Sequence, residues 1–175
     1  MKIHRAHLFA IAVVAALSGH AFAAETKVVV SSMHICCKSC VEGINAALKP
    51  VADVTFQVDK ASETVSLTGK DSAAAQAAVD ALAAAGFHGK TDSKEVVMKE
   101  ASGVPDGKVA KLEVSNIHNC CGKCTTAIEK AINTVPGVKS TTAKAKITTF
   151  TIEGDFEAKA VVKALSDAGF HATVK

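Results

Sequence analysis

Six cysteines, gathered in two short clusters, are the residues of this chain with the clearest capacity for chemistry. The first cluster lies in residues 34–40 (HICCKSC) and the second in residues 118–124 (HNCCGKC), so each holds a Cys-x-x-Cys pair preceded by a third cysteine. This spacing lets two sulfurs point at one ion, and thiolates are soft ligands that select Cu(I), Zn(II) or Hg(II) over Mg(II) or Ca(II). A helix that begins inside the pair adds its positive N-terminus, which lowers the pKa of the thiols.

The clusters are poorly placed for structural disulfides. A bridge within one cluster would close almost no loop, and three cysteines per cluster leave one unpaired. A thiol–disulfide redox protein is the alternative function, because Cys-x-x-Cys pairs also shuttle electrons in oxidising compartments. The residues before the pairs, Ile35-Cys36 and Asn119-Cys120, lack the aromatic side chain common in thioredoxin-like sites. Metal binding is therefore the preferred hypothesis.

A second repeated sequence shows that the chain is duplicated. Residues 85–88 (AGFH) recur as residues 168–171, in the same order relative to the cysteine clusters. Two landmarks that recur in one order indicate two copies of one unit.

Hydrophobic periodicity predicts the same element order in each copy: strand, helix, strand, strand, helix, strand. The first strands are expected in residues 27–33 and 111–115, each followed by a helix after the cysteines. Each copy then has two strands in which apolar and polar residues alternate; in the second copy they include Thr148, Phe150 and Ile152. A second helix follows, over about 72–85 in the first copy and about 156–168 in the second. Gly86 and Gly169 are expected to end those helices.

The βαββαβ order predicts an α+β protein of two ferredoxin-like sandwiches in tandem, each with two helices on one face of an antiparallel sheet. The units are expected at residues 26–91 and 109–175. Residues 92–108, with Gly and Pro, form a linker in which residues 95–98 could add a short strand.

Residues 1–23 have the features of a secretory signal peptide. Lys2 and Arg5 form a basic start, residues 8–17 form a short apolar run, and residues 21–23 (AFA) place small residues where a signal peptidase reads. We expect cleavage near Ala24 and export, most simply to the periplasm, an oxidising compartment.

Composition argues against several other function classes. The formal net charge is +3 and the chain contains no Trp or Tyr, so it offers neither a basic stripe nor aromatic platforms for nucleic acid. The sequence also shows no Ser-His-Asp set and no Gly-rich phosphate loop, and we expect no enzyme activity.

The two halves resemble the heavy-metal-associated domain family, which includes copper chaperones, amino-terminal domains of P-type ATPases and the periplasmic mercury-binding protein. The resemblance rests on residues 37–48 and 121–132, on the βαββαβ order, and on Ala-Gly-Phe after the second helix. It implies that Cys37, Cys40, Cys121 and Cys124 are metal ligands. It also implies a carrier or sequestering buffer for Cu(I), with Zn(II) or Hg(II) as other cargoes, that exchanges its ion with a membrane metal transporter or another metal-binding protein.

The loops depart from the family pattern, which has Gly-Met-x before the first cysteine. Cys36 and Cys120 add a third thiol to each loop, and His34 and His118 add an imidazole. These four residues are further candidate ligands, and a set of three sulfurs and one nitrogen suits tetrahedral zinc as well as trigonal copper.

Other residues near the loops have simpler expected roles. Ile35 can replace the family Met that packs under the metal loop, whereas Asn119 has no evident equivalent role. His88 and His171 are candidate accessory ligands, and Phe87 and Phe170 are expected to be core or lid residues that shield the site.

Overall fold

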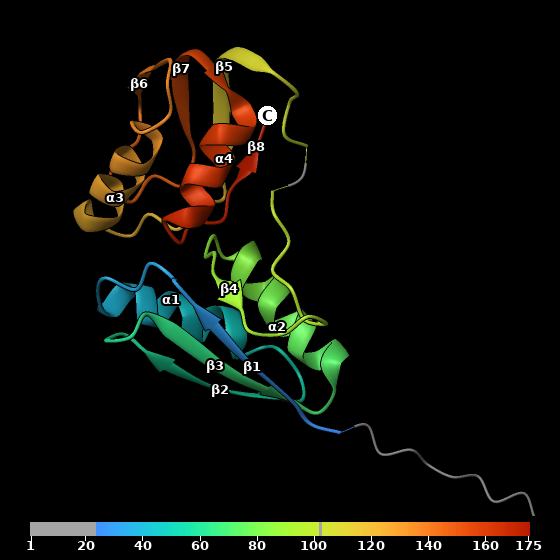
Figure 1. Ribbon diagram of the computed structural model, residues 1–175. Coiled ribbons are helices and arrows are strands. Elements are labelled where there is room, and N and C mark those ends of the chain that lie inside the picture. Colours follow the sequence, from blue (N-terminus) through green and yellow to red (C-terminus); the bar gives the residue numbers. More distant parts are fainter. Residues whose placement is uncertain (1–23, 102) are drawn as a thin grey trace, which may run out of the picture.

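The computed structural model describes residues 24–101 and 103–175. The predicted signal peptide, residues 1–23, lies outside this part of the chain and stays a prediction. Figure 1 shows two units, one above the other, joined by a segment that runs along one side. Among the described residues, no helix is both long and apolar enough to cross a membrane.

Each unit has four strands and two helices in the predicted order. The first unit consists of β1 (Thr26–Ser31), α1 (Lys38–Leu48), β2 (Val54–Asp59), β3 (Thr64–Gly69), α2 (Ser72–Ala84) and β4 (Lys90–Thr91). The second unit consists of β5 (Lys108–Ser115), α3 (Gly122–Ile132), β6 (Val138–Thr141), β7 (Phe150–Glu157), α4 (Ala158–Asp167) and β8 (Thr173–Val174).

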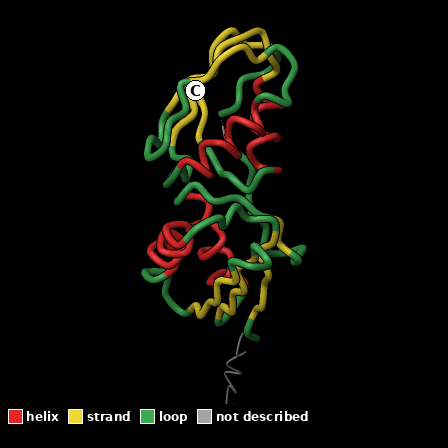
Figure 2. Tube along the Cα trace, turned by 90° about the vertical axis from the view of Figure 1, so that its left-hand side faces the viewer, coloured by secondary structure: helices red, strands yellow, loops and turns green. Residues whose placement is uncertain are grey.

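Two antiparallel sheets carry the helices. Their strand orders are β2-β3-β1-β4 and β6-β7-β5-β8, so the first and third strands of each unit are central. The residues buried in β1, Val28 and Val30, alternate with exposed ones, as expected for a sheet with one covered face. Helices α1 and α2 pack together on that face (Figures 1 and 2). The mixed α/β composition is confirmed, and the arrangement is consistent with a ferredoxin-like fold.

Two local predictions were wrong. Residues 95–98 form no strand, because the Gln76 side chain both donates to the Val97 carbonyl and accepts from its N–H, at 2.9 Å each, in place of a strand partner. In the second unit β7 begins only at Phe150, and Thr148 lies in the loop before it. Strand β7 then continues through Glu157, so α4 begins later than predicted.

The segments that follow α2 and α4 join the two units. Phe87 and Phe170 form an antiparallel bridge and are each 1% exposed. The His88 N–H donates to the Gly169 carbonyl at 3.0 Å, and the His171 N–H donates to the Gly86 carbonyl at 3.0 Å. This reciprocal pairing of residues 86–88 with residues 169–171, here called the junction, fixes how the units face each other.

Only glycine fits the first position of each junction segment. Gly86 has φ +83° and Gly169 has φ +85°, in the left-handed region. A Cβ on Gly86 would lie 2.3 Å from the backbone nitrogen of His118, and one on Gly169 would lie 2.3 Å from that of His34. The cysteine loop of each unit therefore passes directly over the glycine of the other.

We expect Gly86→Ala and Gly169→Ala each to lower the free energy of unfolding by at least about 1 kcal/mol, since alanine at positive φ costs this much before any clash. Urea denaturation measures the effect. Gly122→Ala is the matched control, because a Cβ there meets nothing within 4 Å, and its stability should be unchanged or slightly higher. Equal stability of Gly86→Ala and Gly122→Ala would show that the junction does not form in solution.

Candidate metal centre

The cysteines of each unit lie where a loop enters a helix. Cys37 is the N-cap of α1 and Cys121 is the N-cap of α3, both with extended backbone. Cys40 and Cys124 follow in the first helical turn and are fully buried. The Cys40 N–H donates to the Cys37 carbonyl at 3.2 Å, which closes the turn. Each Cys-x-x-Cys pair thus sits at the positive end of a helix dipole.

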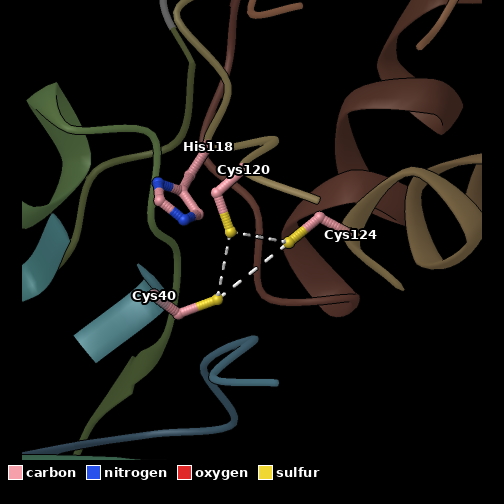
Figure 3. A group of neighbouring side chains, drawn as sticks. All are labelled: Cys40, His118, Cys120 and Cys124. Atoms are coloured by element: carbon pink, nitrogen blue, oxygen red, sulfur yellow. Dashed lines mark hydrogen bonds between the residues drawn. The ribbon is translucent and has the colours of Figure 1, made fainter. Parts of the chain in front are cut away.

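All six cysteine sulfurs gather at one place between the units. The six-sulfur cluster consists of Cys36, Cys37, Cys40, Cys120, Cys121 and Cys124, all free thiols. Ten sulfur–sulfur contacts of 3.6–4.0 Å connect them. Figure 3 shows Cys120 and Cys124 of the second unit turned toward Cys40 of the first. The two cysteine loops therefore meet in one cluster of thiols.

The third cysteine of each loop reaches across to the other unit. Cys36 lies 3.9 Å from Cys121 and 3.7 Å from Cys124. Cys120 lies 3.6 Å from Cys37 and 3.7 Å from Cys40. These two residues connect the Cys-x-x-Cys pairs.

The imidazoles of His34 and His118 border the cluster. Each packs against a phenylalanine of the opposite unit: His34 lies tilted against Phe170, with ring centroids 4.6 Å apart, and His118 stacks on Phe87 at 4.1 Å. Both Nε2 atoms are buried and have no hydrogen-bond partner. A buried, unpartnered ring nitrogen is a free donor for a cation, so the residues present fit a metal ion.

Three groups of side chains place their donor atoms within 4.8 Å of one another. These are Cys40 with His118, Cys120 and Cys124; His34 with Cys36 and Cys124; and Cys36 with Cys37 and Cys121. All eight predicted ligands fall in at least one group. Their role as ligands stays a prediction, but the structure brings every one of them to the same place.

His88 and His171 are placed elsewhere. Their rings stack on each other, with centroids 5.9 Å apart, and neither joins any of the three groups. His88 Nε2 lies 3.5 Å from a carboxylate oxygen of Glu100, which also accepts a hydrogen bond from Ser166. The prediction that they are accessory ligands finds no support in this geometry.

Two further residues explain how the loops are held. Ile35 is 2% exposed and packs beneath its loop, as predicted. Asn119, for which the sequence indicated no role, is equally buried and donates to the carbonyls of Lys144 and Ile147 at 2.8 and 3.1 Å. The side chain of Thr125 donates to its amide oxygen. Asn119 thus ties the second cysteine loop to the loop before β7.

The close packing of the thiols shifts their pKa values in opposite directions. The pKa of Cys40 is lowered to about 2, chiefly because its thiolate accepts a hydrogen bond from Cys124. Its hydrogen bond to Cys40 raises the pKa of Cys124, and burial raises that of Cys36 to about 12 and also that of Cys120. Without cations, Cys36, Cys120 and Cys124 therefore ionise less readily than free thiols. Bound cations would allow the remaining thiols to ionise.

One comparison with known protein families bears on this site. Residues 111–171 match the model of the heavy-metal-associated domain family. No curated protein sequence matches the chain. The solution structure of the N-terminal soluble domains of Bacillus subtilis CopA is similar, at 19% identity and a TM-score of 0.32, over 87% of this chain and 95% of that one. The crystal structure of the first two RRM domains of the yeast poly(U) binding protein Pub1 is 12% identical, with a TM-score of 0.24, over 86% of this chain and 98% of that one.

The second unit is thus assigned as a heavy-metal-associated domain, and the family match together with the cysteine cluster indicates heavy-metal binding. The family match does not extend to the first unit, whose element order and cysteine loop are nevertheless the same.

Acid should destabilise the metal-free protein through His88 and His171. Burial lowers the pKa of both imidazoles below the ordinary value of 6.5. The unfolded chain then binds more protons than the folded one just below that pH, so stability is lost as the pH falls through 6.5. We expect the urea midpoint of the reduced, metal-free chain to fall between about pH 7.5 and about pH 5.5.

The comparison chain is His88→Gln with His171→Gln, which keeps the cysteines unchanged. Its urea midpoint should fall clearly less over the same pH range. If both chains lose the same stability, the titrating groups lie elsewhere and the imidazoles are not buried as described.

Proposed function

We propose that this chain is an exported, non-enzymatic metal-binding protein that carries or sequesters a thiophilic ion, Cu(I) foremost, with Zn(II) or Hg(II) as other cargoes. The observation that carries the proposal is the convergence of six cysteine sulfurs and two unpartnered imidazole nitrogens at one place. Such a donor set is soft and matches these ions.

The proposal includes two tandem heavy-metal-associated domains. The second unit matches the family model, and the first repeats its strand order, its cysteine loop at a helix N-terminus and its Gly-Phe-His segment. The family's role in metal binding then extends to both halves of the chain.

The electrostatics of the site support the binding of a cation. Helices α1 and α3 both direct their N-termini toward the sulfurs, which stabilises thiolate when a metal is present. The pKa of Cys121 is lowered to about 7, mainly because its sulfur accepts a hydrogen bond from the backbone N–H of Cys124. This thiol, at an open edge of the site, is the one best suited to begin an exchange of metal with a partner.

The partner that we propose is a membrane metal transporter or another metal-binding protein that also presents thiols. Cys37 and Cys121 are partly exposed at the helix N-caps, whereas Cys40 and Cys124 are buried. Incoming ligands would therefore reach Cys37 or Cys121 first. Lys38 is 89% exposed beside that edge and could pair with an acidic partner.

Competitive titration tests the proposal. The mature chain from Ala24, reduced and kept anaerobic, is titrated with Cu(I) and with Zn(II) against chromophoric chelators. We expect tight binding of at least one of these ions. Replacing Cys37, Cys40, Cys121 and Cys124 together by alanine should weaken it at least about 100-fold, or about 2.7 kcal/mol. Alanine suits these sites, because buried cysteine behaves as a small apolar residue.

Ser39→Ala is the matched control, since Ser39 lies between Cys37 and Cys40 in the first turn of α1 but is exposed and belongs to none of the groups of donor atoms. Its affinity should equal that of the parent chain. Failure of the parent chain to compete for any of these ions, together with a readily cycled Cys37–Cys40 disulfide, would instead support a thiol–disulfide redox protein.

A further inference from the structure

We infer that the six cysteines form a single polynuclear Cu(I) site shared by the two units, rather than one Cys-x-x-Cys site in each. In this arrangement Cys36 and Cys120 are bridging ligands that tie the units together. The inference rests on the proposed metal-binding function and goes beyond it in stating how many ions bind, to which sulfurs, and with what effect on the two units.

The sulfur contacts define an octahedron. In an octahedron each vertex touches four others and lies opposite one. Five of the fifteen sulfur pairs make none of the ten contacts. Three of these five include every cysteine once, and we assign them as the three diagonals: Cys36 with Cys120, Cys37 with Cys124, and Cys40 with Cys121. The ten observed contacts are edges of this figure. The two remaining edges of the octahedron are Cys36–Cys37 and Cys120–Cys121, which join cysteines adjacent in sequence. The sulfurs of Cys36 and Cys37 lie within 4.8 Å of each other.

This topology decides the coordination number. Any four vertices of an octahedron include an opposite pair, so no four sulfurs are mutual neighbours, as a tetrahedral site of four thiolates requires. Three sulfurs on one face are mutual neighbours. With metal–sulfur bonds of about 2.3 Å, three sulfurs around a planar, three-coordinate ion lie about 4.0 Å apart, close to the observed contacts. Cu(I) accepts three thiolates in this way, so the all-sulfur faces favour Cu(I) over Zn(II).

The faces also determine how many ions fit. Four alternate faces of an octahedron use each vertex twice, so about four Cu(I) ions could bind three sulfurs each, with every sulfur bridging two ions. The thiols release their protons to solvent as they bind. About four positive and six negative charges leave a net charge of about −2 on the loaded site, which the N-termini of α1 and α3 face.

One smaller site competes with this arrangement. Cys40, Cys120 and Cys124 with His118 supply three sulfurs and one nitrogen within 4.8 Å (Figure 3), a set suited to one tetrahedral zinc. It would use only half of the sulfurs and leave Cys36, Cys37 and Cys121 unbound. The two arrangements therefore predict different stoichiometries and different roles for Cys36.

The fold requires both units for the shared site. Two edges join the third cysteine of one loop to the buried cysteine of the other unit: Cys36–Cys124 at 3.7 Å and Cys40–Cys120 at 3.7 Å. The junction holds the loops at this distance without metal. Bound Cu(I) would add bonds across the same interface and hold the units together more tightly.

The experiment counts ions on the intact chain. The reduced protein from Ala24 is loaded with Cu(I) under a competing chelator, and native mass spectrometry gives the distribution of bound ions. We expect one loaded species with about four ions and few species in between, because ions that share sulfurs bind cooperatively. Luminescence typical of solvent-shielded Cu(I)–thiolate clusters should rise with the same stoichiometry.

Two variants separate a shared site from independent ones. Cys36→Ala with Cys120→Ala leaves both Cys-x-x-Cys pairs intact, so independent sites would still bind two ions, whereas the shared site should lose its multi-ion species and its luminescence. Replacing Cys36, Cys37 and Cys40 by alanine should reduce the capacity from about four ions to about one. Ser39→Ala should leave the distribution unchanged.

Each alternative result has a distinct meaning. Two Cu(I) ions on the parent chain, with no change in Cys36→Ala/Cys120→Ala, would overturn the shared site but leave the proposed function standing. A single tightly held Zn(II), unaffected by Cys36→Ala and not displaced by Cu(I), would also overturn it. Absence of binding by every ion tested would overturn the proposed function as well.

Discussion

The reciprocal pairing of residues 86–88 with residues 169–171 is the contact on which the rest of the structure depends. Each segment donates a backbone hydrogen bond to the other, and each glycine lies under the cysteine loop of the opposite unit with no room for a side chain. Phe87 and Phe170 fill the space beside the pairing and receive the imidazoles of His118 and His34. Because these contacts cross between units, the two helix N-termini that carry the cysteines are forced to meet.

The meeting of two helix N-termini creates a site that is incomplete without cations. Helix dipoles favour thiolate, but burial and the close approach of sulfurs oppose the accumulation of several negative charges. Accordingly, the pKa of Cys40 is lowered, whereas the pKa values of Cys36, Cys120 and Cys124 are raised. Soft cations would remove the conflict, since they replace thiol protons and neutralise the thiolates.

The two cysteine loops reach the same geometry by different means. In the first unit Ile35 packs into the apolar core beneath the loop. In the second unit Asn119 is buried at the same position and instead binds backbone carbonyls of the loop before β7. A buried amide is acceptable there only because its polar atoms are satisfied. The positions of the sulfurs are therefore kept while the support beneath them has changed.

Sequence alone determined the element order, the α+β class, the placement of each Cys-x-x-Cys pair at a helix start and the eight candidate ligands, because these follow from local periodicity and residue type. It missed the late start of β7 and wrongly offered a strand at residues 95–98, since a side chain of α2 supplied the pairing. Only the tertiary structure decided that the two loops form one cluster and that His88 and His171 lie outside it. Those facts depend on contacts between units, such as Gly86 against His118, and no local pattern encodes them.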